Sequence, residues 1–131
     1  MTATDLMTIR EMCDAFDVTP RTLRFYEAKE LIAPHRQGAR RLYTRKDRAR
    51  LKLILRGKRF GFSLEDIRQI LNLYEREGSN LQQMQRTYDL AQDRLRIMEA
   101  QRDELTVAIT ELRAELAAGA DLIATVRKAA E

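Results

Sequence analysis

Cysteine, histidine and aromatic residues are scarce in this chain. Of 131 residues, one is cysteine (Cys13), one is histidine (His35), and 6% are aromatic. A single cysteine excludes a disulfide and a metal site of several thiolates within one chain, and a single histidine excludes a His-rich metal site and most acid–base catalysis. We therefore expect no enzyme, no metal site and no cofactor, and Cys13 fits the apolar face of a helix.

Long apolar runs are also absent. No stretch approaches the roughly 20 apolar residues that a membrane helix needs. The start, MTATDLMTIR, lacks the basic and apolar blocks of a secretory signal. We therefore expect a cytoplasmic protein with no membrane partner. A length of 131 residues allows one small domain with an appendage, since domains usually have about 100–150 residues.

Charge is divided unevenly along the chain. Residues 1–59 have 15 Lys/Arg and 7 Asp/Glu, a net charge of +8, whereas residues 60–131 have 9 and 13, a net charge of −4. A basic half attached to an acidic half indicates that the first contacts a polyanion. An uneven solvated surface would give the same composition, so the motifs must distinguish the two interpretations.

Helix starts are marked by capping boxes, in which Ser or Thr is followed three residues later by an acid or amide. They lie at Thr8, Thr44, Ser63 and Ser79. A different start is Thr19 followed by Pro20, because proline at the first helical position loses no hydrogen bond. Only Asp17 and Val18 separate the first two helices, so these helices must cross steeply, as in a helix-turn-helix.

The pattern changes after Leu31, where Pro34 stops the helix and Gly38 permits a chain reversal. We expect a short β-hairpin here, a wing whose strands of three or four residues are stable only when packed on the helices. A third helix over about 44–58 and a fourth from residue 63 add enough apolar residues for one small core. Residues 1–76 are therefore expected to form a winged helix-turn-helix domain.

An apolar stripe with alternating steps of three and four residues begins at Leu81. Its members are Leu81, Met84, Tyr88, Ala91, Leu95, Met98, Leu105, Ile109, Leu112 and Leu116, with Arg102 in one core-type position. Five heptads at about 1.5 Å per residue span about 54 Å, too far for the stripe to be buried against one small domain. We expect residues 79–118 to form a dimerisation helix; the alternative is a helix folded back on its own domain. Gly119 is expected to end it, before a short tail helix over 119–131.

Basic and aromatic residues of the second helix and the wing are the candidates for DNA contact. The start of a recognition helix reaches base edges in the major groove, and a basic hairpin suits backbone or minor-groove contact. The candidates are Thr19, Arg21, Thr22, Arg24, Phe25, Tyr26 and Lys29 in the helix, Arg36, Arg40, Arg41 and Tyr43 in the wing, and Lys58 and Arg59 beside Arg56. Ordinary helix-end cations are the alternative for the last group.

Several segments together resemble the MerR family of bacterial transcription regulators. They are Thr8-Ile9, the sequence TPRTLRFYE from Thr19, Arg41-Leu42-Tyr43, and GFSLEDI from Gly61. The resemblance spans residues 7–74 and continues into the long helix. It implies a mainly α fold whose long helices pair as an antiparallel coiled coil. It also implies a homodimer that binds a near-palindromic promoter site in double-stranded DNA. In response to a signal, such a dimer distorts the DNA so that RNA polymerase can use the promoter.

The chain departs from the family pattern in ways that concern its signal. Arg40 stands where the family's wing often has tyrosine, and no cysteine follows Cys13, whereas metal-sensing members have cysteines beside the end of the dimerisation helix. Drug-sensing members append a large domain, and only a short segment follows Gly119. Residues 48–59 resemble the branch that controls branched-chain amino acid and fatty acid breakdown, which implies an acyl-CoA-like effector.

Two other functions fit parts of the sequence. An architectural, excisionase-like DNA-bending protein would use the same basic half, but it has no need of five heptads. A coiled-coil adaptor would use the long helix alone and would have no affinity for DNA at moderate salt.

Overall fold

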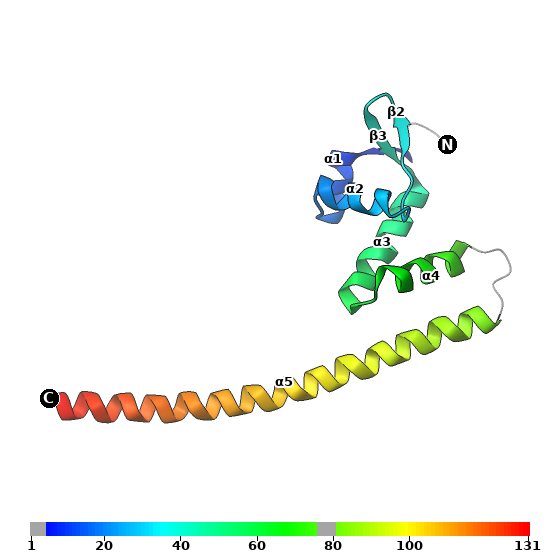
Figure 1. Ribbon diagram of the computed structural model, residues 1–131. Helices are drawn as coiled ribbons and strands as arrows, with labels where there is room; N and C mark the ends of the chain where they lie inside the picture. Colours follow the sequence, from blue (N-terminus) through cyan, green and yellow to red (C-terminus); the bar gives the residue numbers. More distant parts are fainter. Residues whose placement is uncertain (1–4, 76–80) are drawn as a thin grey trace. The chain divides into compact units, whose positions relative to one another are not determined.

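The computed structural model describes residues 5–75 and 81–131, which divide into two compact units, one up to residue 90 and one from residue 91. The elements are β1 (Met7–Thr8), α1 (Ile9–Phe16), α2 (Pro20–Ala28), β2 (His35–Gln37), β3 (Arg40–Tyr43), α3 (Arg45–Phe60), α4 (Leu64–Glu75) and α5 (Leu81–Ala130) (Figure 1). The predicted mainly α class is confirmed. Within the described ranges, no helix combines the length and apolarity needed to cross a membrane.

Full capping boxes begin α1 and α3, as predicted. The Thr8 hydroxyl accepts a hydrogen bond from the Glu11 amide at 3.2 Å, and the Glu11 carboxylate accepts one from the Thr8 amide at 2.9 Å. Thr44 and Asp47 make the same reciprocal pair, at 3.1 and 2.9 Å. Each box satisfies two amide groups that would otherwise lack a partner at the helix start.

The other predicted helix starts are at Ser63, Thr19 and Ser79. Ser63 and Asp66 exchange hydrogen bonds of 3.1 and 3.2 Å at the start of α4. The Thr19 hydroxyl accepts from the Thr22 amide, with proline next at the first position of α2. Between α1 and α2 the chain turns through Asp17 in the left-handed region (φ 53°), which confirms the predicted helix-turn-helix. Ser79 lies outside the described residues.

One hydrophobic core holds the first unit together. Its buried members are Met12, Leu23, Tyr26, Leu31, Ile32, Tyr43, Leu51, Ile54, Ile67 and Leu71. Cys13 packs against this cluster, as predicted, and burial raises the pKa of its thiol. Because helices α1 to α4 and strand β3 all contribute, the core sets the position of α2 relative to the wing.

Helices α3 and α4 approach closely at Gly57. A Cβ atom at this position would lie 2.8 Å from Cγ1 of the buried Ile67. Gly61 ends α3 in the left-handed region (φ 84°), and the Phe62 amide donates to the Gly57 carbonyl at 3.0 Å. The helix continues past the predicted end at residue 58, because Gly61 and not Gly57 supplies the conformation that terminates it.

The predicted wing is present and has an additional strand beside it. In the β2–β3 hairpin, His35 pairs with Leu42 and Gln37 with Arg40, and Gly38 (φ 63°) makes the turn. Strand β1 pairs with the other side of β3, so the strand order is β1-β3-β2. Strand β1 was not predicted, because a strand of two residues is too short to show alternation.

Helix α5 is continuous from Leu81 to Ala130. The prediction that Gly119 ends this helix before a separate tail helix is therefore wrong. An interior glycine costs only about 1 kcal/mol relative to alanine, and the neighbours Ala117, Ala118 and Ala120 are strong helix formers. Since the helix does not break, Ile123 and Val126 continue the seven-residue spacing of the apolar stripe.

Candidate nucleic-acid interface

The outward face of α2 is basic. Leu23 and Tyr26 are 0% and 2% exposed and hold the helix on the core. Arg21, Arg24 and Lys29 are exposed, and among the described residues none of these three has a carboxylate partner. Three cations without acidic partners on one helix make a surface suited to phosphates and base edges.

The first turn of α2 is already organised by hydrogen bonds. The Thr19 hydroxyl accepts from the Thr22 amide at 3.2 Å and lies 2.9 Å from the Thr22 hydroxyl. Both residues are predicted DNA contacts, and their hydroxyls are used within the cap. Each hydroxyl retains further hydrogen-bonding capacity, since a hydroxyl has one donor and two acceptor positions.

Phe25 lies beside these cations on α2 and is 42% exposed. The Lys29 ammonium lies 5.7 Å from the centre of the Phe25 ring, a cation–π contact. The Phe25 and Tyr26 rings are tilted, with their centres 5.7 Å apart. This ring therefore joins the core residue Tyr26 to the exposed cation Lys29, and it keeps an apolar patch within a basic surface.

Two predicted DNA contacts are wrong. Tyr43 is 0% exposed and Tyr26 is 2% exposed, so both rings belong to the core and neither side chain reaches the surface of the domain. Burial raises the pKa of both phenols. Both residues were predicted from the basic and aromatic side chains around them, but local sequence does not show which of these rings the folded core buries.

Two wing arginines are joined to α2 by Glu27. Arg36 Nη2 donates to Glu27 Oε1 and Arg41 Nε donates to Glu27 Oε2, each at 2.7 Å. Burial raises the pKa of Glu27, but the hydrogen bonds from Arg41 and Arg36 outweigh it, and the net pKa is lowered. Glu27 was not predicted as a site residue, because nothing in local spacing indicates that a helix residue meets both strands of a later hairpin.

Arg40 differs from the other two wing arginines. It is exposed at the start of β3 and has no carboxylate partner within hydrogen-bonding distance among the described residues. Its Cα partner Gln37 is uncharged. Of the three predicted wing cations, Arg40 is therefore the one that makes no salt bridge among the described residues, and its only acidic interaction there is a charge interaction that contributes to lowering the pKa of Glu11.

Buried and half-buried groups fix the end of α2 and the segment leading to the wing. Arg68 of α4 donates to the Lys29 carbonyl at 2.5 Å, and Arg50 of α3 donates to the Leu31 carbonyl at 2.5 Å. The Asp47 carboxylate, 3% exposed, accepts from the Ala33 amide at 3.0 Å. These contacts connect residues up to 39 positions apart, so local patterns contain no sign of them.

The second predicted basic group is at the end of α3. Arg56, Lys58 and Arg59 are exposed, and they have no ion-pair partner within the part of the chain that the structure describes. Lys58 and Arg59 lie in the last turn, where cations also stabilise the helix dipole. The position of this group is compatible both with contact to DNA phosphates and with stabilisation of the end of the helix.

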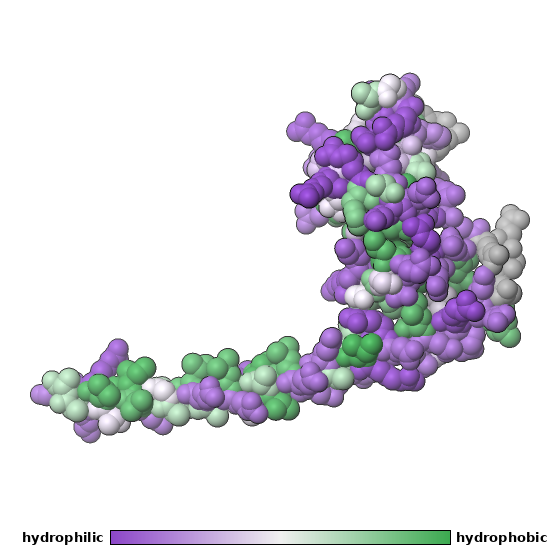
Figure 2. All heavy atoms as spheres, in the orientation of Figure 1, coloured by the Kyte–Doolittle hydropathy of each residue, from purple (hydrophilic) through white to green (hydrophobic). Residues whose placement is uncertain are grey.

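The predicted dimerisation residues line α5 and are exposed in the single chain. Leu81, Tyr88, Leu95, Leu105, Leu112 and Leu116 are 55–78% exposed, and Met84, Met98 and Ile109 are 37–50% exposed. Figure 2 shows apolar surface recurring along this helix. Unlike the side chains of the core, these residues remain in contact with water. Burying them against a partner helix would be favourable by about 25 cal/mol for each Å² of apolar surface removed from water.

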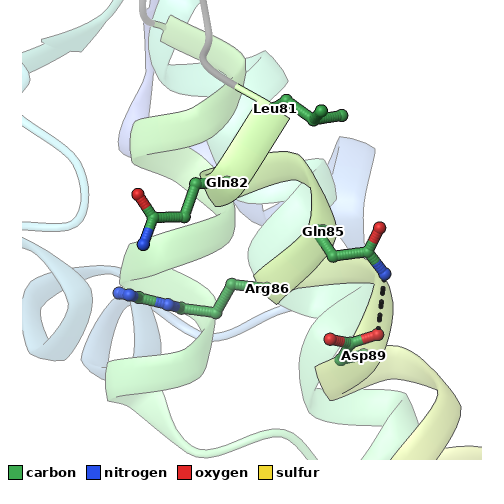
Figure 3. A pocket seen from close by; sticks show the side chains of 5 residues that line it. All are labelled: Leu81, Gln82, Gln85, Arg86 and Asp89. Atoms are coloured by element: carbon green, nitrogen blue, oxygen red, sulfur yellow. Dashed lines mark hydrogen bonds between the residues drawn. The ribbon is translucent and has the colours of Figure 1, made fainter.

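A hollow on the surface of α5 is open to solvent. Leu81, Gln82, Gln85, Arg86 and Asp89 line it, all from the first turns of the helix, and Gln85 donates to Asp89 at 2.9 Å (Figure 3). A surface formed by one helix does not enclose a small molecule.

Among the described residues, no group of three or more His, Cys, Asp or Glu is placed to hold a metal ion.

Comparison with family models gives two matches. A model described as MerR HTH family regulatory protein matches residues 7–74, and one described as MerR, DNA binding, matches residues 48–115. The chain is 36% identical over 99 residues to the HTH-type transcriptional regulator ZntR of Escherichia coli K12, covering 74% of this chain and 69% of ZntR. It is 34% identical over 101 residues to HmrR of Rhizobium leguminosarum bv. viciae, covering 76% of each.

Solved structures give the same fold. A MerR-family regulator from Bacillus cereus has a TM-score of 0.66 at 25% identity, covering 80% of this chain and 75% of the other. PbrR691 of Ralstonia metallidurans CH34, in complex with lead(II), has a TM-score of 0.61 at 28% identity, covering 82% and 85%. HiNmlR, bound to promoter DNA, has a TM-score of 0.61 over 79% and 78%, and at 22% identity it shows likeness of fold alone.

Proposed function

The chain belongs to the MerR family of transcriptional regulators, and from this premise we propose that it acts as a homodimer on promoter DNA, with α2 and the wing contacting the duplex. It is a DNA-binding transcriptional regulator, and the family match favours this function over an architectural DNA-bending protein or a coiled-coil adaptor. The observation that supports the mode of contact is the set of exposed cations on α2 and the wing that make no salt bridge among the described residues, namely Arg21, Arg24, Lys29 and Arg40.

We assign DNA binding to the basic part of the chain and dimerisation to the acidic part. Residues 1–76 bind DNA, and residues 79–118 pair two copies, with the helix continuing to Ala130. Antiparallel pairing places the two basic domains at opposite ends of a rigid spacer, as a near-palindromic site in one duplex requires. Distorting that site costs on the order of 1–10 kcal/mol, which binding energy supplies, and the distorted promoter is then used by RNA polymerase.

The signal is proposed to be a small molecule of the acyl-CoA type. The support is the resemblance of residues 48–59 to the branch of the family that controls branched-chain amino acid and fatty acid breakdown. Cys13 is the only cysteine and packs against the core, so thiolate ligation of a metal by several cysteines of one chain is ruled out.

The test of the proposed function is the salt dependence of binding. The purified protein is first used to select DNA fragments, and affinity for a selected duplex is then measured by fluorescence anisotropy between about 50 and 200 mM salt. If a dimer neutralises roughly ten phosphates, the logarithm of affinity falls with the logarithm of salt concentration at a slope near −9. A slope near zero, or no selected fragments, contradicts the proposal.

A further inference from the structure

The contact between α2 and the wing depends on one carboxylate. Both oxygens of Glu27 accept hydrogen bonds from arginines, one from β2 and one from β3, at 2.7 Å. The side chains of Glu27 and Arg41 are 18% and 22% exposed, so this ion pair is largely shielded from water, whereas the side chain of Arg36 is 56% exposed. Shielding strengthens charge-assisted hydrogen bonds relative to ion pairs on an open surface.

The two arginines would repel each other without this carboxylate. Arg36 and Arg41 are Cα partners, directly opposite in the β2–β3 ladder. Like charges directly opposite in an antiparallel pair are destabilising, and a hairpin of three- and four-residue strands has little stability of its own. Glu27 therefore neutralises the repulsion within the hairpin and attaches the hairpin to α2 with the same two hydrogen bonds.

We propose that Glu27 is a positioning residue for DNA binding, which holds the wing against α2 and keeps Arg36 and Arg41 from contacting phosphates indiscriminately. The proposal rests on the proposed function, since it concerns how α2 and the wing meet DNA. With Glu27 in place, Arg21, Arg24 and Arg40 contact the duplex from a fixed geometry. Without it, two more cations become available on a hairpin that is no longer held, so affinity for any duplex rises while discrimination falls.

The experiment uses the whole 131-residue chain with Glu27→Gln, and Glu30→Gln as the matched control. Glu30 is exposed, three residues further on, and has no ion pair among the described residues, so both variants remove one negative charge from the same region. Affinity is measured on a duplex selected by the wild-type protein and on a scrambled duplex of the same composition. A third measurement follows the arginine Nε–H resonances by NMR in the absence of DNA.

For Glu27→Gln we expect tighter binding to the scrambled duplex, and a salt slope steeper by about 0.9 for each phosphate newly contacted. The ratio of selected to scrambled affinity falls, and the Arg41 Nε–H resonance loses its protection from exchange. Glu30→Gln leaves the affinity ratio and the resonance unchanged. A hairpin that merely unfolded would lose its cations from the interface, and the slope would become shallower.

A double-mutant cycle of Glu27→Gln with Arg41→Gln makes the test quantitative. The combined effect on the affinity ratio should depart from the product of the single effects by more than about twofold, the usual limit for independent sites. Multiplicative effects within that limit, or an unchanged ratio for Glu27→Gln, overturn the proposal. A wild-type protein that does not distinguish the two duplexes contradicts the proposed function instead.

Discussion

At the scale of single residues, the exposed cations of α2 are the side chains that we propose contact DNA. Arg21 lies two positions before Leu23 and Arg24 lies directly after it, on a helix whose buried face is set by Leu23 and Tyr26. The core therefore determines their direction, and the absence of carboxylate partners among the described residues leaves their hydrogen-bond donors available.

Replacing Arg21 or Arg24 by alanine is expected to weaken binding to a selected duplex. An arginine that contacts a base edge with two hydrogen bonds contributes about 1–3 kcal/mol of discrimination, whereas one that contacts a phosphate changes the salt slope by about 1. Anisotropy titrations at several salt concentrations distinguish the two. Arg127→Ala removes the same charge from the far end of α5 and should change neither quantity; an equal loss in all three variants would contradict the assignment.

The buried hydroxyl of Tyr43 is expected to lower the stability of the protein. Its hydroxyl is buried and has no hydrogen-bond partner among the described residues. A buried polar group without a partner costs about 1–3 kcal/mol, so Tyr43→Phe is expected to raise the free energy of unfolding by about 1 kcal/mol. Guanidinium unfolding followed by circular dichroism measures this change.

The contrast is Tyr43→Ala, which removes the ring as well and should destabilise the protein by about 3–5 kcal/mol. A loss of stability in Tyr43→Phe comparable to that in Tyr43→Ala would show that the hydroxyl has a role that the structure does not account for.

At the scale of elements, two glycines within helices have opposite surroundings. Gly57 is buried where α3 meets α4, and a Cβ there would lie 2.8 Å from Ile67 Cγ1. At Gly119 of α5, a Cβ would meet nothing within 4 Å in the single chain. Both residues have helical backbone, so the difference in neighbours alone separates them.

Gly57→Ala is expected to lower the midpoint of guanidinium unfolding. Overpacking costs about 1–3 kcal/mol, which exceeds or equals the gain of about 1 kcal/mol in helix propensity. Gly119→Ala keeps only the gain and should maintain or raise helix content. The expectation fails if Gly57→Ala is the more stable of the two, since Ile67 would then have room to move.

At the scale of the whole molecule, the apolar stripe of α5 needs a partner. Its leucines are exposed in the single chain, and the uninterrupted helix adds Ile123 and Val126 to the same spacing. A contiguous apolar surface of this kind on a protein of this size is typical of an interface between chains. The acidic net charge of residues 60–131 disfavours contact of this part of the chain with DNA.

Leu95→Asp together with Leu105→Asp is expected to give monomers that no longer bind the selected duplex, because charges in a paired seam cannot be solvated. Analytical ultracentrifugation measures the mass, and anisotropy measures binding. Ala100→Asp with Ala114→Asp introduces the same charges on the opposite face of the helix, and this variant should remain dimeric. Dimers that persist in the leucine double variant would contradict the coiled-coil assignment.

Much of the fold could be predicted from local sequence, because its signals are short-range. The capping boxes at Thr8, Thr44 and Ser63, the Thr19-Pro20 start and the turn at Gly38 depend on groups within three or four positions of each other. The stripe of α5 depends only on periodicity. Gly119 was misjudged, because glycine weakens a helix without necessarily ending it, and the outcome depends on the flanking alanines.

The sequence by itself determined the basic half, the helix starts, the helix-turn-helix and the seven-residue stripe. Only the tertiary structure decided that Tyr26 and Tyr43 belong to the core, that Arg36 and Arg41 meet on Glu27, and that Arg40 makes no salt bridge among the described residues. The physical reason is the separation along the chain of the residues that interact. Caps and periodicity are properties of neighbouring residues, whereas the availability of an arginine for DNA depends on which distant carboxylate the folded chain brings to it.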